Sequence, residues 1–264
     1  MSYRYPFTPF PKGWYRIGMQ EKKIYAFDRE LKLNRRNNGL VFYDIHNPEY
    51  TFPAVEKNSN FFCFYDENHH APYFEVPEIL EFNSQEWQAP FYLSWRARVH
   101  AQEIAENALD LSHFCTVHTY KDVPTLSHFK ISDHQFNVVM HSRKKTMGMV
   151  SNISMDITYH GLGIVVANVA TESGIDLKVL LMTTPIEQEY VDITMGVAIK
   201  KTGNFLKDFI LRKVIPKDVK IEFTRDIPVW ESKIYRSKPL LCQNEGNIVR
   251  IRKWAKQFYV ETNK

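Results

Sequence analysis

The residues of this chain most able to do chemistry lie between positions 106 and 118. This segment has the sequence Glu-Asn-Ala-Leu-Asp-Leu-Ser-His-Phe-Cys-Thr-Val-His, so two imidazoles, His113 and His118, follow the carboxylate of Asp110. Histidines that bind a metal need a scaffold, a nearby carboxylate that fixes the ring tautomer, and a further ligand from elsewhere. Asp226 is the candidate for that further ligand, and the set would then be an iron site.

Helical spacing decides whether these side chains can meet. Residues three or four apart share a face of an α-helix, so Asn107, Asp110 and His113 would be neighbours. His118 would point elsewhere unless the helix ends near Phe114, and the β-branched residues before His118 favour a turn there. The chain has ten histidines. For either ring alone the alternative is therefore an ordinary core or surface role, or a bond to a carbonyl at a helix end.

Asp226 follows the same spacing rule. Glu222, Asp226 and Trp230 would share one helical face. Spacing alone favours another interpretation of Asp226, a solvated carboxylate paired with Arg225. Two histidines and one carboxylate leave open positions on Fe(II) for dioxygen and substrate, which is typical of non-haem iron oxygenases. Zinc accepts the same ligands and remains the rival metal, although the general base of a His-Glu-x-x-His motif is absent here.

Two regions of the chain must position these residues. With 264 residues, of which 44% are hydrophobic, the chain can bury a large core. An N-terminal part rich in Pro, Tyr and Phe predicts a small β region, and a change of character near residue 84 predicts a boundary. We therefore expect two domains, residues 1–83 and residues 84–264.

The second region should contain one sheet and several helices. A helical segment is expected at 101–114, after a strand that begins near residue 92. Alternating polarity in three long stretches predicts strands or hairpins of one curved antiparallel sheet, at 128–146, 151–171 and 175–200. Apolar residues at helical spacing predict long helices within 204–235 and 247–259 that close the domain.

Composition argues against several other classes of protein. The 34 basic and 30 acidic residues are interspersed, so no basic stripe for nucleic acid is expected. No apolar run has the length of a signal peptide or a membrane span, so we expect a soluble, cytoplasmic chain with no integral membrane segment. Cys63, Cys115 and Cys242 lie far apart and cannot all pair, which fits a reducing compartment.

At this point the residues resemble a known family. The motif Glu-Asn-x-x-Asp-x-x-His-Phe-x-x-x-His at 106–118 is similar to the mononuclear-iron signature of Rieske non-haem iron oxygenases. The segments 226–235 and 252–259 resemble most closely the branch of 3-ketosteroid 9α-hydroxylases and cholesterol 7-desaturases. Shorter similarities at 11–15 and 73–79 support the same branch.

One part of the chain departs from that family. Its members hold a [2Fe–2S] cluster with Cys-x-His and Cys-x-x-His, so that two cysteines bind one iron and two histidines the other. The corresponding stretch, 42–48, offers only His46 and no cysteine. His69 and His70 are adjacent, but no second cysteine is close, so we expect them at the surface. We therefore expect no [2Fe–2S] cluster.

The resemblance implies roles for the residues of the motif. His113, His118 and Asp226 would bind Fe(2+), and Asn107 would lie beside the metal. Asp110 would be the catalytic carboxylate that links a neighbouring subunit's cluster to the iron. From physical chemistry alone, Asp110 could also accept the ring N–H of a ligating histidine.

The resemblance also implies a fold and a substrate class. The fold would be α+β, with a helix-grip (START-like) catalytic domain in which a curved antiparallel sheet wraps a long C-terminal helix, plus a small truncated N-terminal β region. Its apolar cavity implies a hydrophobic, sterol-like substrate. Leu111, Phe114 and Leu162 are candidate pocket residues, with a plain core role as the alternative.

These implications define the expected function. The chain would be a non-haem Fe(II)-dependent oxygenase or desaturase that receives electrons from a separate electron-transfer protein or a cluster-bearing paralogue, within a homo- or hetero-trimer. One alternative is iron chemistry in which the substrate itself provides the electrons. Another is a non-catalytic helix-grip protein that binds hydrophobic ligands. The retained ligand set favours an oxidoreductase, because a pure binder would not need it.

Overall fold

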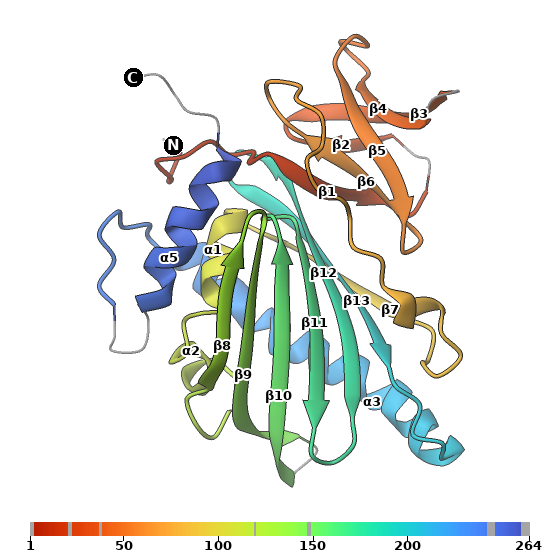
Figure 1. Cartoon of the computed structure of the whole chain (residues 1–264), viewed down its shortest axis with the longest axis vertical. Coiled ribbons are helices and arrows are strands. Elements are labelled where there is room, and N and C mark those ends of the chain that lie inside the picture. Colours follow the sequence, from red (N-terminus) through yellow and green to blue (C-terminus); the bar gives the residue numbers. More distant parts are fainter. Residues whose placement is uncertain are drawn as a thin grey trace.

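Two antiparallel sheets make up most of the structure, a computed structural model in which the smaller sheet lies across one end of the larger (Figure 1). The described residues are 3–20, 23–36, 39–118, 120–146, 149–241 and 246–259. Cys242, one of the three cysteines considered above, lies outside them. Within the described residues, Cys63 and Cys115 are free thiols.

The smaller sheet has six strands in the order β1-β6-β5-β4-β3-β2. Its strands are β1 (Gly13–Gly18), β2 (Ile24–Ala26), β3 (Arg29–Arg36), β4 (Gly39–Asp44), β5 (Thr51–Lys57) and β6 (Asn60–Tyr65). Aromatic side chains dominate its core, where Tyr15, Phe27, Phe42 and Phe52 are buried. This sheet is the small β region expected from the composition of the N-terminal part.

The larger sheet has seven strands in the order β7-β13-β12-β11-β10-β9-β8. Its strands are β7 (Phe91–Ala97), β8 (Thr125–Ser132), β9 (Gln135–Thr146), β10 (Met149–His160), β11 (Ile164–Thr171), β12 (Asp176–Glu187) and β13 (Tyr190–Ile199). All of its pairings are antiparallel. The three predicted β stretches are thus three successive hairpins, and the predicted antiparallel sheet is confirmed.

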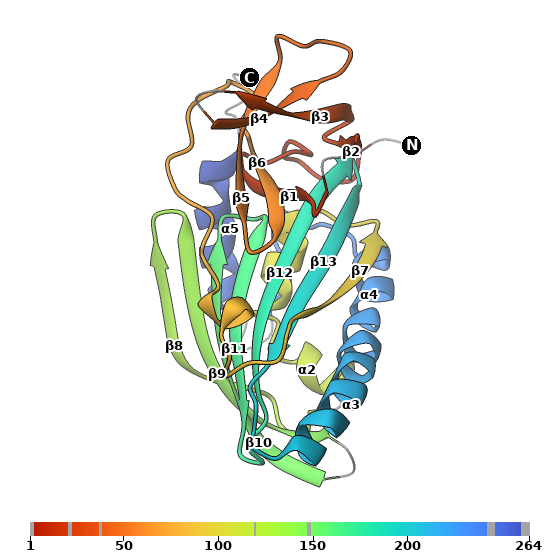
Figure 2. The same ribbon diagram turned by 90° about the vertical axis from the view of Figure 1, so that its right-hand side faces the viewer.

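Helices cover one face of this sheet (Figure 2). They are α1 (Ala101–Asn107), α2 (His113–Thr116), α3 (Phe205–Thr224), α4 (Asp226–Ser232) and α5 (Gly246–Ala255), with single 3-10 turns at η1 (Leu80–Asn83) and η2 (Lys256–Phe258). The predicted C-terminal helices are confirmed, and α3 is the longest. No described helix is both long enough and apolar enough to cross a bilayer.

The two sheets meet near the C-terminal end of β12. The backbone N–H groups of Phe27 and Asp28 donate to the carbonyls of Pro185 and Ile186 at 3.0 and 2.9 Å. At the β10–β11 turn, a Cβ on Gly163 would lie 2.2 Å from the carbonyl oxygen of Trp14. Only glycine therefore allows the first strand to approach this turn so closely.

Candidate metal centre

A break in the predicted helix of residues 101–114 positions the two histidines. Helix α1 ends at Asn107 and α2 begins at His113, so the prediction of one continuous helix is wrong. Oδ1 of Asp110 accepts hydrogen bonds from the backbone N–H of His113 at 3.2 Å and from the Ser112 hydroxyl at 2.9 Å. The bond from His113 satisfies one of the free backbone donors at the start of α2. The turn, rather than one helical face, directs the histidines inward.

Asp226 is supplied by the other end of the chain. It is the first residue of α4, directly after the junction with α3, and its side chain is buried. Arg225 at that junction forms its ion pair with Glu222 at 2.8 Å. The alternative of a solvated Asp226 paired with Arg225 is therefore wrong.

His113, His118 and Asp226 meet at one point in the interior. Nε2 of His113 lies 2.6 Å from Oδ1 of Asp226. Nε2 of His118 lies 3.1 Å from the same oxygen and 3.0 Å from Nε2 of His113. Among the described residues, this is the only group of three or more His, Cys, Asp or Glu side chains that could share a metal ion.

The spacing of the three donor atoms fits a first-row divalent metal. Such an ion, about 2.1 Å from each donor, would hold donors in adjacent coordination positions about 3 Å apart. The three observed separations, 2.6, 3.0 and 3.1 Å, lie close to that distance. Two imidazoles and one carboxylate on one side of the ion are also the donor set of the non-haem iron facial triad.

The electrostatics of the three candidate donors favours a charged pair. Burial alone would lower the pKa of His118, but hydrogen bonds to Asp226 and Glu222 outweigh it and raise the pKa to about 9. Burial likewise would raise the pKa of Asp226, yet its bonds with the two histidines lower it. A metal cation would replace the proton on His118 as the positive partner of this carboxylate.

Glu222 orients His118 from the far side of the ring. Its Oε2 lies 3.4 Å from Nδ1 of His118, which leaves Nε2 of that ring directed toward Asp226. Lys144 on β9 lies 3.4 Å from the same carboxylate. Glu222 is therefore placed for the orienting role that physical chemistry made available to Asp110. In the described part of the chain, neither imidazole is a hydrogen-bond partner of Asp110.

Asn107 lies where the resemblance implied, beside the three donors. Its Nδ2 is 3.3 Å from Nε2 of His113 and 3.5 Å from Oδ1 of Asp226. Because Asn107 is the last residue of α1, this helix and the His113 turn enter the site together.

A cavity of about 300 Å³ lies between the large sheet and α3, next to this site. Asn107, His118 and Asp226 form part of its wall. Most of the wall is apolar and comes from Ile104, Ala108, Phe114, Ile153, Met155, Ile157, Ala167, Val169, Ile175, Leu177, Val179, Leu181, Met195, Ile215, Val219, Phe223 and Trp230. Its polar side chains are Tyr120, Tyr159, Lys144, Thr171, Asp218 and Glu222.

Of the three predicted pocket residues, one lines the cavity and two do not. Phe114 lines the cavity. Leu111 is buried outside the lining, and Leu162 belongs to the core around Phe136 and Phe258. The sequence analysis missed Lys144, whose even-numbered position on β9 shares the inward face with Met140 and Ser142.

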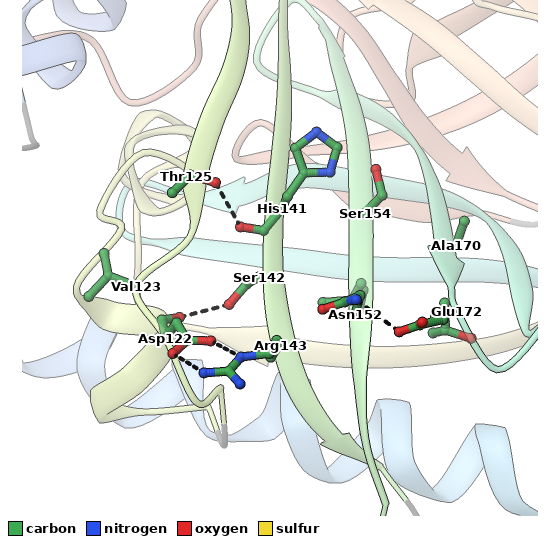
Figure 3. Close-up of a pocket in the computed structure, with 12 residues that line it drawn as sticks. Asp122, Val123, Thr125, His141, Ser142, Arg143, Asn152, Ser154, Ala170 and Glu172 are labelled. Carbon is green, nitrogen blue, oxygen red and sulfur yellow. Dashed lines mark hydrogen bonds and ion pairs between the residues drawn. The ribbon is translucent and has the colours of Figure 1, made fainter.

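A second, wider hollow lies on the outer face of the large sheet (Figure 3). Its polar side chains pair with one another, as Arg143 does with Asp122 and Asn152 with Glu172. It contains none of the three donor residues. The cavity on the inner face is therefore the better candidate for a substrate site.

A family model described as the 3-ketosteroid 9α-hydroxylase C-terminal domain matches residues 63–259, which is most of the chain. The chain belongs to this family. The resemblance drawn from the 106–118 motif and the C-terminal segments is therefore confirmed. As a member of the 3-ketosteroid 9α-hydroxylase C-terminal domain family, the chain carries its three candidate donors inside the matched region.

Curated relatives of this family member are oxygenase components and desaturases. A "probable 3-ketosteroid-9-alpha-monooxygenase, oxygenase component" of Rhodococcus rhodochrous is 26% identical over 229 residues, covering 80% of this chain and 57% of the relative. A cholesterol 7-desaturase of Caenorhabditis elegans is 26% identical over 246 residues, covering 81% and 55%. The chain thus spans little more than half the length of the curated relatives it matches.

Solved structures share the fold. Dicamba monooxygenase bound to dicamba superposes with a TM-score of 0.71 and 14% identity, covering 93% of this chain and 96% of the other. Pseudomonas putida NdmA with caffeine superposes with a TM-score of 0.66 and 13% identity, covering 92% and 89%. The structural similarity extends over both sheets of this chain.

Proposed function

We propose that this chain is an oxidoreductase that binds one ferrous ion through His113, His118 and Asp226 and oxidises a hydrophobic substrate. The observation that carries this proposal is the meeting of three donors from distant parts of the chain at the wall of an apolar cavity. A protein that only bound an apolar ligand would have no need to bury two imidazoles and a carboxylate together.

Iron is favoured over zinc by chemistry. Both metals accept this donor set, but zinc has no redox chemistry. The named reactions of the relatives, a monooxygenase and a desaturase, are oxidations. When bound, ferrous iron would supply the dioxygen-activating redox chemistry.

The chain's own residues would hold and shape the site. Glu222, whose Oε2 lies 3.4 Å from Nδ1 of His118, would pair with that side of the ring and so keep Nε2 free to bind the metal. Asp110 fixes the turn that presents His113. Phe114, Phe223 and Trp230 exclude water from the cavity side of the donors.

We propose that the substrate is largely apolar and carries a polar group. The aliphatic wall of the cavity would hold a hydrophobic, sterol-like skeleton. Lys144, 3.4 Å from Glu222 and 4.0 Å from Asp218, would donate to an oxygen of the substrate. The curved sheet wrapped around α3 supports the helix-grip description of this domain.

We propose that electrons come from a separate protein or a cluster-bearing paralogue within a trimer. Residues 1–83 would be a cluster-free counterpart of a Rieske domain, and 84–264 the catalytic domain. The one cysteine of the first region, Cys63, is fully buried, and burial raises the pKa of its thiol, whereas a cluster ligand must be a thiolate.

Anaerobic reconstitution with ferrous iron tests the proposal. We expect one iron per chain, together with substrate-dependent oxygen uptake when a ferredoxin, its reductase and a 3-ketosteroid or cholesterol are supplied. Asp226→Ala should remove both iron and uptake, because it deletes one donor and leaves the histidines without their carboxylate. Asp192→Ala, an exposed aspartate paired with Arg96, is the matched control.

Retained stoichiometric iron in Asp226→Ala would refute the ligand set. Stoichiometric iron in the wild type without uptake for any steroid tested would refute steroid oxidation with electrons from a ferredoxin and leave the ligand set standing.

A further inference from the structure

The first three turns of α3 carry an apolar surface that the cavity and the donor site do not use. Phe205, Leu206, Phe209 and Ile210 are 87%, 65%, 55% and 42% exposed. Single exposed apolar residues are normal on a protein surface, but four large ones within six positions form a patch that indicates an interaction site.

Basic side chains surround this patch. Residues 205–220 contain five exposed lysines and arginines and two aspartates. Asp208 is occupied as an acceptor from the backbone N–H and hydroxyl of Thr202, at 2.8 Å each, and Asp218 lies 4.0 Å from Lys144. In the described part of the chain none of the five cations has a carboxylate partner. They are Lys207, Arg212, Lys213, Lys217 and Lys220.

We propose that the exposed face of α3 from Phe205 to Lys220 forms a docking surface for an anionic lipid bilayer. Exposed Phe and Leu side chains beside lysines and arginines have the chemistry of a segment that lies in the membrane interface. Each Lys or Arg near an anionic surface adds to the attraction. An isologous contact with a second copy would instead bring like charges together, in a chain whose net charge is already +4.

The position of α3 leaves this surface free to dock. The start of α3 lies at one end of the long axis of the molecule, whereas β1 and α5 lie toward the other end (Figure 1). Nζ of Lys207 lies 3.4 Å from the carbonyl oxygen of Ser173, in the turn whose Thr171 and Ile175 line the cavity. Docking would therefore bring this end of the apolar cavity close to the bilayer.

Vesicle co-sedimentation of the full chain tests the proposal. We expect sedimentation with vesicles of phosphatidylcholine and phosphatidylserine, and less of it at high salt or with phosphatidylcholine alone. Phe205→Ser with Leu206→Ser, and separately Lys213→Glu with Lys217→Glu, should each lower partitioning about tenfold. Iron content should not change, so the result is independent of the proposed enzyme activity.

Ile234→Ser with Leu240→Ser is the matched control, because these side chains are 78% and 85% exposed in a different segment. Unchanged circular dichroism would establish that all variants fold. The proposal is overturned if the wild type fails to bind anionic vesicles, or if both α3 variants bind as the control does. It is also overturned if light scattering shows that the wild type self-associates through this patch without binding lipid.

Discussion

At the scale of single residues, Glu222 connects the candidate metal site to both α3 and the large sheet. Its carboxylate contacts Nδ1 of His118, the ammonium of Lys144 and the guanidinium of Arg225. Burial would raise the pKa of Glu222, but these cationic partners outweigh burial and lower it. Glu222 is therefore an anionic partner for the His118 ring.

Replacing Glu222 by glutamine should weaken ferrous binding by about 10–100-fold, the usual effect of removing a partner of a ligating histidine. The reason is that a neutral amide holds the Nδ1 proton of His118 less firmly. An anaerobic titration measures the effect, with Glu172→Gln, whose carboxylate bonds Asn152 on the outer face, as control. Equal affinities for the variant and the wild type would show that Glu222 does not orient the ring.

The pH dependence of iron binding follows from His118. The pKa of this imidazole is raised from 6.5 to about 9, so the stabilisation from its charge is fully present below pH 6.5 and is lost as the pH rises through 9. Iron must displace that proton, so the apparent affinity should rise about tenfold per pH unit between these values. Anaerobic titrations across this window measure the slope. An affinity that does not vary with pH would contradict the raised pKa.

The sequence predicted the grouping of the three candidate donors better than their surroundings. The meeting of His113, His118 and Asp226 could be predicted because residue types and motif spacing are read directly from the sequence. Glu222 was already on the predicted face with Asp226, which was a usable signal for its role. Lys144 was missed because an inward lysine on a strand looks like any alternating surface residue until the helix opposite is placed.

At the scale of elements, α1 is held against α5 by a buried ion pair. Nε and Nη2 of Arg252 donate to the two oxygens of Glu106 at 2.9 and 2.8 Å, and Glu106 is almost fully buried. Asn107 follows Glu106 directly, so this ion pair also holds in place one residue of the candidate metal site.

Arg252→Ala should lower the free energy of unfolding by about 3–5 kcal/mol, because it leaves the buried Glu106 carboxylate without its cationic partner. Chemical denaturation measures the loss, and Lys253→Ala, an exposed neighbour on the same helix, should change little. If the two variants are equally stable, the ion pair does not hold α1 in place.

The strand hairpins and C-terminal helices were predictable because their hydrophobic periods are long and regular. The interruption of the predicted helix at residues 108–112 was not. This segment contains no glycine or proline that would predict a break in the helix. The turn is instead stabilised by the hydrogen bonds that Asp110 accepts from Ser112 and His113. Strands β1, β2 and β5 lack the regular alternation of apolar and polar residues that would distinguish them from loops.

At the scale of the whole molecule, the small sheet lies against the end of the large one through close backbone approach. A Cβ on Gly163 would lie 2.2 Å from the Trp14 carbonyl and 2.8 Å from the Tyr15 ring. Such a joint between distant segments has no signature in the sequence beyond the glycine itself.

Gly163→Ala should therefore destabilise the fold by about 1–3 kcal/mol, because the added methyl group forces β1 away from the β10–β11 turn. Thermal or chemical unfolding measures this change. Ala170→Gly serves as a control for altering β11. Ala170 lies near the other end of this strand, on its outer face, where no described residue of the small sheet makes such a contact. Undiminished stability of Gly163→Ala would mean that the two sheets are not held as described.

The convergence of His113, His118 and Asp226 on one ferrous ion is the claim on which the account depends. Crystals grown anaerobically with ferrous iron and measured at the iron absorption edge test it directly. We predict a single anomalous peak within bonding distance of Nε2 of both histidines and a carboxylate oxygen of Asp226. A map of a fully iron-loaded crystal with its peak elsewhere, or with no peak between these side chains, would contradict it.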